Sequence, residues 1–497
     1  MSERSTARAR PRQPPERLST PAGELQRVAS NVWELPASAR ADMRVPARVF
    51  ADRELLEQIA GDRSLEQLQN VATLPGIVEA ALAMPDIHQG YGFPVGGVAA
   101  TEPPDGVISP GGVGYDINCG VRLLALPLSA GELGARRAAL VHEISRRVPV
   151  GAGQGGSLRL ARDALDLVLA HGSRALLDGH GIGSELDVQH TESHGCIDGA
   201  DPAAVSERAR ERGSDQLGTL GSGNHFLELQ RVRDVIDPQA AAAFGLREGQ
   251  VTVLIHSGSR GLGHQVCSDY VRLMDQALAR HRIVLPDRQL ACAPLSSAEG
   301  QRYLAAMAAA ANFAWANRAA LAHRVREAVR IVLGAQLAGE TRQIYDVAHN
   351  VAKLERHRGR TLCVHRKGAT RAFPPGSSEI PGAHRAVGQA VFIPGSMGTS
   401  SFVLAGRPAA MELSFGSACH GAGRRMSRTG ARRQIGGAEL RRQLEAQGIV
   451  VRCPSNRGLA EEAPFAYKDV ERVVAVVESA GLARRVAQLE PLGVVKG

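Results

Sequence analysis

Short glycine-rich segments recur along this chain where strand-like runs end, and this pattern limits the folds that the chain can adopt. Strand-like segments cover residues 251–255, 361–364, 390–393 and 449–453. Helical patterns cover residues 53–71, 158–169, 203–212, 300–337, 437–447 and 470–489. The two kinds of element mix without a steady βαβ rhythm, so we expect an α+β fold with a mixed β-sheet core flanked by helices. Loops at strand ends are where sites are usually assembled, so we expect the active site to be built from the glycine-rich loops.

Domain organisation follows from where the apolar pattern begins. Residues 1–25 are rich in Arg, Pro, Ser and Glu without periodic apolar positions, which indicates a disordered basic tail. No linker or repeat interrupts residues 26–497, so we expect a single catalytic domain there. The first 25 residues lack the apolar core of a secretory signal, and the most apolar stretch, Tyr303–Asn317, is too short to span a membrane. The seven scattered cysteines argue against a disulfide framework, so we expect a cytoplasmic protein without a membrane partner.

Net charge is +9, and only four of the 59 basic residues are lysines. This balance favours a polyanionic partner, although drift in composition explains it equally well. None of the four lysines follows Gly and precedes Ser or Thr, so the phosphate-binding P-loop is excluded.

Five side chains in the glycine-rich segments are candidate metal ligands. Asp116 and Cys119 lie three residues apart in one such loop, and His225, His256 and His349 each lie at the end of a strand-like or glycine-rich run. One carboxylate, one thiol and three imidazoles suit one or two ions of Mn²⁺, Fe²⁺, Co²⁺ or Zn²⁺ better than Mg²⁺ or Ca²⁺. The alternative is that Cys119 is a small buried apolar residue and that each histidine is a hydrogen-bonded structural one.

His420 is a candidate for phosphate chemistry. Gly-Ala-Gly follows it, so backbone amides can approach a phosphate, and Arg424 and Arg428 can offset the charge. A histidine in this setting can attack phosphorus and form a phosphoramidate. The alternative is a histidine that binds phosphate or a third metal ion. The loop Pro394–Ser401 offers further amides and hydroxyls, and His365–Arg371 adds three cations for a backbone or a triphosphate.

The longest motifs, taken together, resemble one known family. They are Asp86–Gly97, Ser109–Gly120, Leu217–Glu228, Ile255–His264, His365–Phe373, Pro394–Leu404, Ser417–Arg424, Glu461–Asp469 and the terminal Lys496-Gly497. From about residue 40 to the last residue the chain is similar to the RtcB family of GTP- and manganese-dependent RNA ligases. Tyr115 stands where the family more often has Phe, a difference that we expect to matter little.

The resemblance implies a role for each matching residue. Asp116, Cys119 and His225 would hold one Mn²⁺, and Cys119 would bridge to a second that His256 and His349 complete. His420 would be the guanylylated nucleophile, and Asp86 an acidic residue of the active site. The positions expected around GTP are Asn224, Glu228, His349, Asn350, Pro394, Gly395, Ser396, Met397, Ser401, His420, Gly421, Ala422, Gly423, Tyr467 and Lys496. Of these, Tyr467 would stack on the base and Glu228 would read the guanine edge. The residues expected to meet RNA phosphates are Arg260, Lys367, Arg371, Arg424 and Arg428.

The family's chemistry implies an RNA ligase for tRNA splicing or RNA repair. It would join 2′,3′-cyclic phosphate or 3′-phosphate ends to 5′-hydroxyl ends through a GMP-histidine intermediate and an RNA end activated with GMP. We expect a monomer, and the need for an archease activator stays open, as do the RNA substrate and the metal used in the cell. Two alternatives remain: a metal-dependent RNA cyclic phosphodiesterase or phosphohydrolase on the same scaffold, and an RNA-binding protein without catalysis.

Overall fold

The N-terminal part of the described chain belongs to a β-sheet. The computed structural model describes residues 16–151, 153–156 and 158–497. Within it, β1 (Arg17–Thr20) and β2 (Gly23–Ala29) form an antiparallel pair, and Leu25 of β2 is completely buried. The expected tail therefore does not reach residue 25, because residues 17–20 and 23–29 form strands, with Leu25 in the apolar core and Leu18 packed against it. Residues 1–15 of the expected tail lie outside the described residues.

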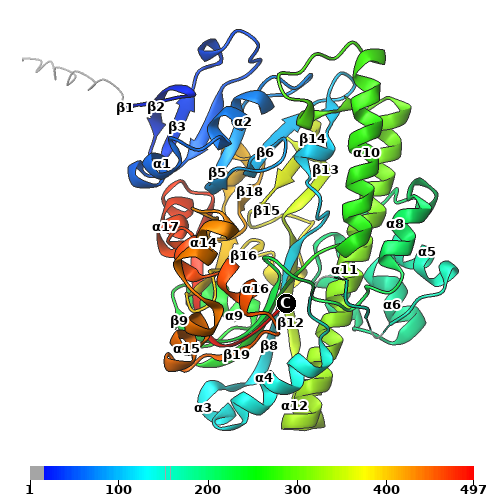
Figure 1. Ribbon diagram of the computed structural model, residues 1–497, viewed down its shortest axis with the longest axis vertical. Coiled ribbons are helices and arrows are strands. Elements are labelled where there is room, and N and C mark those ends of the chain that lie inside the picture. The colour runs from blue at the N-terminus through cyan, green and yellow to red at the C-terminus, as the bar shows by residue number, and fades with distance from the viewer. Residues whose placement is uncertain (1–15, 152, 157) are drawn as a thin grey trace, which may run out of the picture.

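One eight-stranded sheet carries Asp86. Its strand order is β1-β2-β3-β4-β5-β6-β14-β13 (Figure 1). The remaining strands are β3 (Val32–Leu35), β4 (Ala47–Phe50), β5 (Ala81–His88), β6 (Val95–Thr101), β13 (Asn350–His357) and β14 (Arg360–Lys367). Neighbouring strands run antiparallel except β4 and β5. The pairing of β5 with β6 shifts register between Ala83 and His88. Such irregularities re-aim side chains, and this one contains Asp86.

The second eight-stranded sheet explains why residues far apart in sequence meet. Its order is β12-β8-β10-β9-β20-β17-β16, with β19 beside β20. These strands are β8 (Gly120–Ser129), β9 (Phe226–Val235), β10 (Gln250–Ser257), β12 (Arg342–Ala348), β16 (Ala390–Ile393), β17 (Ser401–Gly406), β19 (Val450–Arg452) and β20 (Ala483–Lys496). The neighbours β12, β8, β10 and β9 are antiparallel, so the starts of β8 and β9 and the ends of β10 and β12 share one edge. Four of the five expected metal ligands, Cys119, His225, His256 and His349, lie at that edge.

The same sheet curls around an apolar core. Tyr345 of β12 and Phe392 of β16 come from opposite ends of the strand order, yet they belong to one buried cluster. Two short pairs complete the β-structure: β7 (Val107–Ile108) with β11 (Ala293–Pro294), and β15 (Ala369–Arg371) with β18 (Ser417–Cys419). Strand β18 ends immediately before His420.

The helix expected over 470–489 is confirmed in its first half and wrong in its second half. Helix α17 (Val470–Ser479) ends two residues before Gly481, and the chain then forms β20 from Ala483 onward. Gly481 has φ +80°, and Leu482 N–H donates to Val477 O, which together form a glycine-terminated helix end. The chain therefore turns at Gly481, and the apolar residues beyond it form an interior strand of the second sheet, between β9 and β17.

The other expected elements are mostly confirmed. The helices are α1 (Arg53–Ile59), α2 (Ser64–Val71), α3 (Ala130–Leu133), α4 (Arg136–Arg147), α5 (Arg162–His171), α6 (Ser173–His180), α7 (Glu185–Gln189), α8 (Glu207–Gly213), α9 (Pro238–Phe244), α10 (Arg260–Arg280), α11 (Ala298–Leu333), α12 (Ala335–Gly339), α13 (Pro408–Leu413), α14 (Arg428–Gln434), α15 (Gly437–Ala446) and α16 (Asn456–Glu461). The helix expected over 53–71 is split in two around Gly61, since glycine weakens a helix interior. The four expected strands correspond to β10, β14, β16 and β19.

Helix α11 supports the edge where the ligands gather. It packs against α10 along one side of the molecule (Figure 1), and its middle is buried. Arg318 of α11 pairs with Asp346 at 2.8 Å and donates to the carbonyls of Asn118 and Ser257, with all of these groups buried. The helix thus holds the loop before β8 and the end of β10 with a charged side chain. Among the described helices, none combines the length and apolar character that a membrane crossing requires.

Candidate active site

Most of the expected site residues line one pocket of about 300 Å³. Those that line it are Asp116, Cys119, Asn224, His256, His349, Asn350, Lys367, Pro394, Gly395, Ser396, Met397, His420, Gly421, Ala422, Gly423, Arg424, Arg428, Tyr467 and Lys496. Those that do not are Asp86, His225, Glu228, Arg260, Arg371 and Ser401. Eight further residues line the pocket without a role predicted from the sequence: His88, Val95, Gly114, Tyr115, Phe226, His264, Gly368 and Glu462. All eight lie inside the long motifs, which is the signal that could have identified them.

The five expected metal ligands form two groups that share one thiol. Cys119 Sγ lies 3.3 Å from His225 Nε2 and 3.2 Å from His256 Nε2, and His256 Nε2 lies 3.3 Å from His349 Nε2. Asp116 Oδ2 is 2.7 Å from His225 Nε2. One group is therefore Asp116, Cys119 and His225, the other Cys119, His256 and His349, and the ligand atoms of each lie within 4.8 Å of one another. The donor set of carboxylate, thiolate and imidazole fits transition-metal ions.

Burial sets the protonation of these ligands. Desolvation lowers the pKa of His225, and it lowers the pKa of His256 and His349 well below the ordinary value, so their lone pairs are available. Desolvation, reinforced by Asp116, raises the pKa of the Cys119 thiol well above 9. Burial also raises the pKa of Asp116, but the charge and hydrogen bond of His225 outweigh burial and lower it. Binding of a metal ion must therefore displace a proton from Cys119.

Arg260 supports the cluster from the first turn of α10. Its Nη1 lies 2.8 Å from His225 Nδ1, so the guanidinium helps to fix the orientation of the ring whose Nε2 faces Asp116. A side chain at Gly221 would overlap the guanidinium, so the glycine makes room for it. Arg260 is thus a neighbour of a candidate ligand and not part of the pocket wall.

His420 is held in one orientation by Asp86. His420 Nδ1 lies 2.6 Å from Asp86 Oδ2, and the same oxygen accepts the backbone N–H of His420 at 3.2 Å. The Asp86 carboxylate is completely buried, and the ring of His420 lies 4.7 Å from that of His349. Gly423 passes so close to Asp86 O that a Cβ there would lie 2.2 Å away. The imidazole therefore keeps Nδ1 on Asp86 and has Nε2 free for chemistry.

A buried carboxyl lies under the loop Pro394–Ser401. Glu228 Oε2 accepts from Gln230 Nε2 at 2.6 Å, and Gln230 also contacts Ser401 Oγ, which accepts from the Gly395 N–H at 3.2 Å. Glu228 Oε1 is buried without a partner, and desolvation raises the pKa of this carboxyl to about 8. An unpaired buried oxygen is costly, which favours a ligand donor at this point.

Tyr467 closes another part of the pocket. Arg424 lies over its ring at 4.9 Å, and Glu462 binds the Tyr467 hydroxyl. Glu462 also pairs with Arg424 at 3.0 Å and with Arg428 at 2.9 Å. One buried carboxylate thus orients two arginines and a tyrosine around the same space.

The C-terminal end of β20 lies beside the loop that carries His225, one of the candidate metal ligands. Lys496 Nζ donates to the carbonyls of Gly223 and His225, and desolvation lowers its pKa. The last strand therefore fixes the loop that carries His225.

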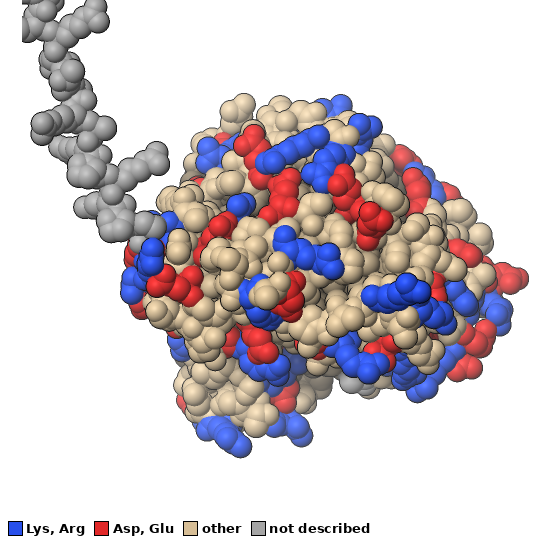
Figure 2. All heavy atoms as spheres, turned by 90° about the horizontal axis from the view of Figure 1, so that it is seen from above, with Lys and Arg blue, Asp and Glu red and all other residues tan. Residues whose placement is uncertain are grey.

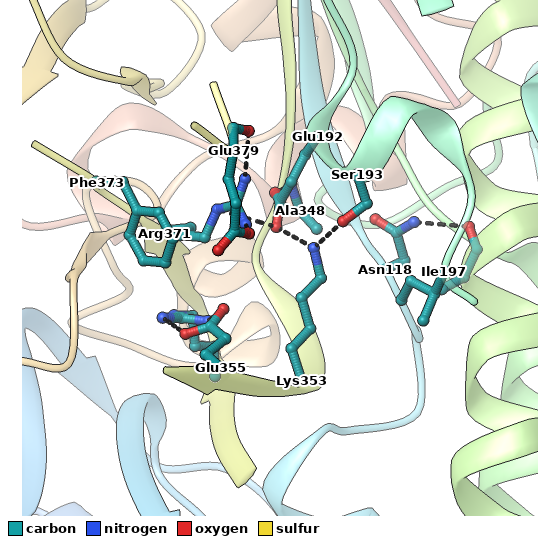
Figure 3. A network of polar contacts seen from close by, with 12 residues as sticks. Asn118, Glu192, Ser193, Ile197, Ala348, Lys353, Glu355, Arg371, Phe373 and Glu379 are labelled. Atoms are coloured by element: carbon teal, nitrogen blue, oxygen red, sulfur yellow. Dashed lines mark hydrogen bonds and ion pairs between the residues drawn. The ribbon is translucent and has the colours of Figure 1, made fainter. Parts of the chain in front are cut away.

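A buried ionic network contacts Ala348, the residue before His349 in the chain (Figure 3). Glu192 Oε2 accepts the backbone N–H of Ala348 at 2.8 Å, one residue before His349, and Glu192 Oε1 lies 2.5 Å from Lys353 Nζ. Lys353 also donates to Ser193 Oγ at 2.7 Å. Ser193 and the next residue have positive φ, which is uncommon outside glycine. This backbone conformation is what brings Glu192 and Ser193 to the same ammonium group.

Arg371 belongs to this network and not to an RNA surface. Its side chain is 1% exposed, bonds Glu379 at 2.6 Å and lies over the ring of Phe373 at 4.5 Å (Figure 3). The expectation that Arg371 meets RNA phosphates is therefore wrong, because it is buried away from the pocket. Lys367 does line the pocket, but its ammonium is directed to the carbonyls of Tyr91 and Gly111, and burial lowers its pKa to about 8.

The positive net charge does not form a single patch on the face seen from above. Figure 2 shows Lys and Arg side chains interspersed there with Asp and Glu. Many surface arginines are paired, for example Arg174 with Glu185 and Arg288 with Asp275. Within the pocket itself, Arg424 and Arg428 are cations that line the wall, and both pair with Glu462.

Comparison with known proteins identifies the class of protein to which this chain belongs. The family model described as "tRNA-splicing ligase RtcB" matches residues 67–497. The tRNA-splicing ligase RtcB of Archaeoglobus fulgidus is 52% identical over 482 residues, covering 96% of this chain and 99% of that protein. That of Thermococcus kodakarensis is 53% identical over 478 residues, covering 95% and 99%. The RNA-splicing ligase RtcB of Mycobacterium tuberculosis is 53% identical over 439 residues, covering 87% and 100%.

The family model and these relatives are named as RNA- or tRNA-splicing ligases, which makes this chain an RNA ligase of the same class. The chain belongs to the RtcB family.

Proposed function

We propose that this protein is an RNA ligase that joins a 2′,3′-cyclic phosphate or 3′-phosphate end to a 5′-hydroxyl end, using GTP. The family membership supports RNA ligation. The observation that carries the mechanism is His420: its Nδ1 is fixed on Asp86, and its ring lies against His349 of the metal cluster. A nucleophile held in one tautomer beside a candidate metal site is what covalent transfer of a nucleotide needs.

In the first covalent step, the lone pair of His420 Nε2 attacks the α-phosphorus of GTP. A P–N bond forms, the bond to the β-phosphate oxygen breaks, and pyrophosphate leaves with that electron pair. Positive charge develops on the ring, and the Asp86 carboxylate stabilises the proton at Nδ1. Asp86 is therefore a positioning and charge-balancing residue for His420.

Guanosine recognition is assigned to Tyr467, which lines the pocket, and to Glu228, which lies outside its lining beneath the loop Pro394–Ser401. Glu228 Oε1, the buried oxygen without a partner, would accept from the guanine edge beneath the loop Pro394–Ser401. Tyr467, held by Glu462 and Arg424, would stack on the base. Lys496 and the amides after His420 would lie near the phosphates.

The cluster fits two Mn²⁺ ions, one held by Asp116, Cys119 and His225 and one by Cys119, His256 and His349. When bound, such ions stabilise the negative charge that develops on a transferred phosphoryl group. The fit rests on the donor set: neutral buried imidazoles around a thiol that two groups share.

The remaining steps act on the RNA ends and return His420 to its starting state. Where the RNA ends in a cyclic phosphate, water first opens it to a 3′-phosphate. An oxygen of the 3′-phosphate then attacks the GMP phosphorus, the P–N bond breaks, and His420 regains its lone pair. Finally the 5′-hydroxyl oxygen attacks the phosphorus of the 3′-phosphate, the P–O bond to GMP breaks, GMP leaves with that electron pair, and the hydroxyl proton is released to water. Arg424 and Arg428, which both line the pocket, would hold RNA phosphates.

Labelling with α-³²P-GTP tests the proposal. The wild type and His420→Ala are incubated with Mn²⁺ and the labelled nucleotide, with an archease-type activator supplied in a parallel sample, and resolved on a denaturing gel. An acid-labile, base-stable label on the wild type alone is the expected result. No label on the wild type under either condition, with opening of a cyclic phosphate retained, would replace the ligase with the phosphohydrolase alternative.

A further inference from the structure

The rings at the pocket are unusual for this chain, in which aromatic residues make up only 4%. All six tyrosines lie in the described part of the chain. Tyr270, Tyr303 and Tyr345 are buried in the core. The other three are partly exposed: Tyr467 and Tyr115 line the pocket, and Tyr91 contacts Tyr115. Tyrosine surface is thus concentrated at the site.

Tyr115 lies in a row of three rings on the metal side of the pocket. Its ring centroid is 5.2 Å from that of Tyr91, edge to face, and 5.7 Å from that of His264, with an interplanar angle of 26°. His264, on the second turn of α10, is exposed and lines the pocket. The row is therefore open at its His264 end.

Rigid backbone holds this row. Lys367 donates to Tyr91 O, and Gln289 accepts the N–H of Gly92 at 3.0 Å. Tyr115 immediately precedes Asp116, whose carboxylate accepts the N–H of Ser259 at 3.0 Å, just before α10. Preorganised rings lose little entropy when a flat ligand stacks on them.

We infer that Tyr115 and His264 form a stacking site for a nucleobase of an RNA end. Successive bases stack on exposed aromatic side chains in single-strand binding sites. Tyr467 packs instead with Arg424 and Glu462, and it is already assigned to guanine. The second stacking surface lies beside Asp116, so its ligand should be a nucleotide at the RNA junction. This is either the nucleotide with the 3′-phosphate or the one with the 5′-hydroxyl. This inference rests on the proposed ligase function and adds an RNA subsite to it.

The test crosses protein variants with base-free substrates. His264→Leu and Tyr115→Leu remove a ring, whereas the control variants His264→Phe and Tyr115→Phe keep one. Each is assayed with intact RNA, with an abasic 3′-phosphate nucleotide and with an abasic 5′-hydroxyl nucleotide. We expect a leucine variant to raise the KM for intact RNA roughly tenfold. For the abasic substrate that lacks the base which normally stacks here, the same variant should change the KM little. The phenylalanine variants should stay close to the wild type.

The combination separates the possible outcomes. If the effect of the leucine variants on KM disappears with one of the two abasic substrates, the base missing from that substrate is the one that stacks, and this identifies the RNA strand. An equal loss with intact RNA and both abasic substrates would overturn the inference, including the case in which a variant is merely misfolded. Failure of the ligase proposal would appear separately, as a wild type that GTP does not label. The same cycle would then be measured as binding affinity for the oligonucleotides, which needs no GTP.

Discussion

Asp86 and His420 are 334 residues apart in sequence and lie 2.6 Å apart, carboxylate to Nδ1, in the fold. Asp86 comes from an irregular stretch of β5, and His420 from the residue after β18. The carboxylate leaves His420 Nε2 as the nitrogen that can react. This pair joins the two halves of the site, because the ring of His420 also contacts that of His349.

Replacing Asp86 tests this relationship. An asparagine can donate to Nδ1 and favour the tautomer with hydrogen on Nε2, which is not nucleophilic. We expect Asp86→Asn to slow single-turnover labelling by GTP about 100-fold or more. Asp105→Asn, at an exposed loop position, is the matched control and should label at the wild-type rate. A labelling rate of Asp86→Asn equal to that of the control would refute the role of the pair.

Metal binding should release a proton from Cys119. Its pKa is raised well above 9 by desolvation, so the thiol is protonated at neutral pH and the metal must displace the proton. Affinity for Mn²⁺ should therefore increase as pH rises. Calorimetry in two buffers of different ionisation enthalpy measures the protons released. We expect fewer for Cys119→Ser than for the wild type, and no change for Cys196→Ser, whose thiol lies outside the cluster.

Glu228 should make stability depend on pH. Desolvation raises its pKa from 4.5 to about 8, so between these values the folded chain binds a proton that the unfolded chain has lost. The contribution of Glu228 to the free energy of unfolding is complete below pH 4.5 and is lost as pH rises toward 8. We therefore expect Glu228→Gln to gain stability relative to the wild type as pH increases from 5 to 8, measured by urea denaturation. An unchanged difference across this range would contradict the prediction.

Glu192 should control both stability and metal affinity. Removing one partner of a buried ion pair leaves an uncompensated charge, so Glu192→Gln should lower the free energy of unfolding by about 3 kcal/mol, because Lys353 stays buried. It should also weaken Mn²⁺ binding, since Glu192 holds the Ala348 N–H beside His349. Glu248→Gln, at an exposed site, is the control.

A double variant separates the two effects of Glu192. Glu192→Leu combined with Lys353→Met removes both charges and every oxygen that could accept the Ala348 N–H, and it should be less destabilised than the sum of Glu192→Leu and Lys353→Met alone. Metal affinity should remain low in the double variant, because the hydrogen bond to Ala348 is not restored. Recovery of both quantities together would mean that only the charge balance matters.

Sequence patterns located most of the helices and strands, because these elements depend on the local periodicity of apolar residues. The strand β10 and the helix α11 appear at the expected positions. The pattern failed at residues 483–489, where apolar residues suit either a helix or a buried strand. The chain turn at Gly481 and the partners β9 and β17 decide for the strand.

Residue types and local motifs already specify the chemistry available at the site: one thiol, several imidazoles and glycine-rich loops with a nucleophile candidate at His420. These are properties of residue types and of neighbours in the chain, which motifs record directly. Tertiary structure decided which of them meet. It placed Arg371 in a buried network and Arg260 behind His225, and it aligned Tyr115 with His264. Such contacts depend on strand order and burial across hundreds of residues, so no local pattern specifies them.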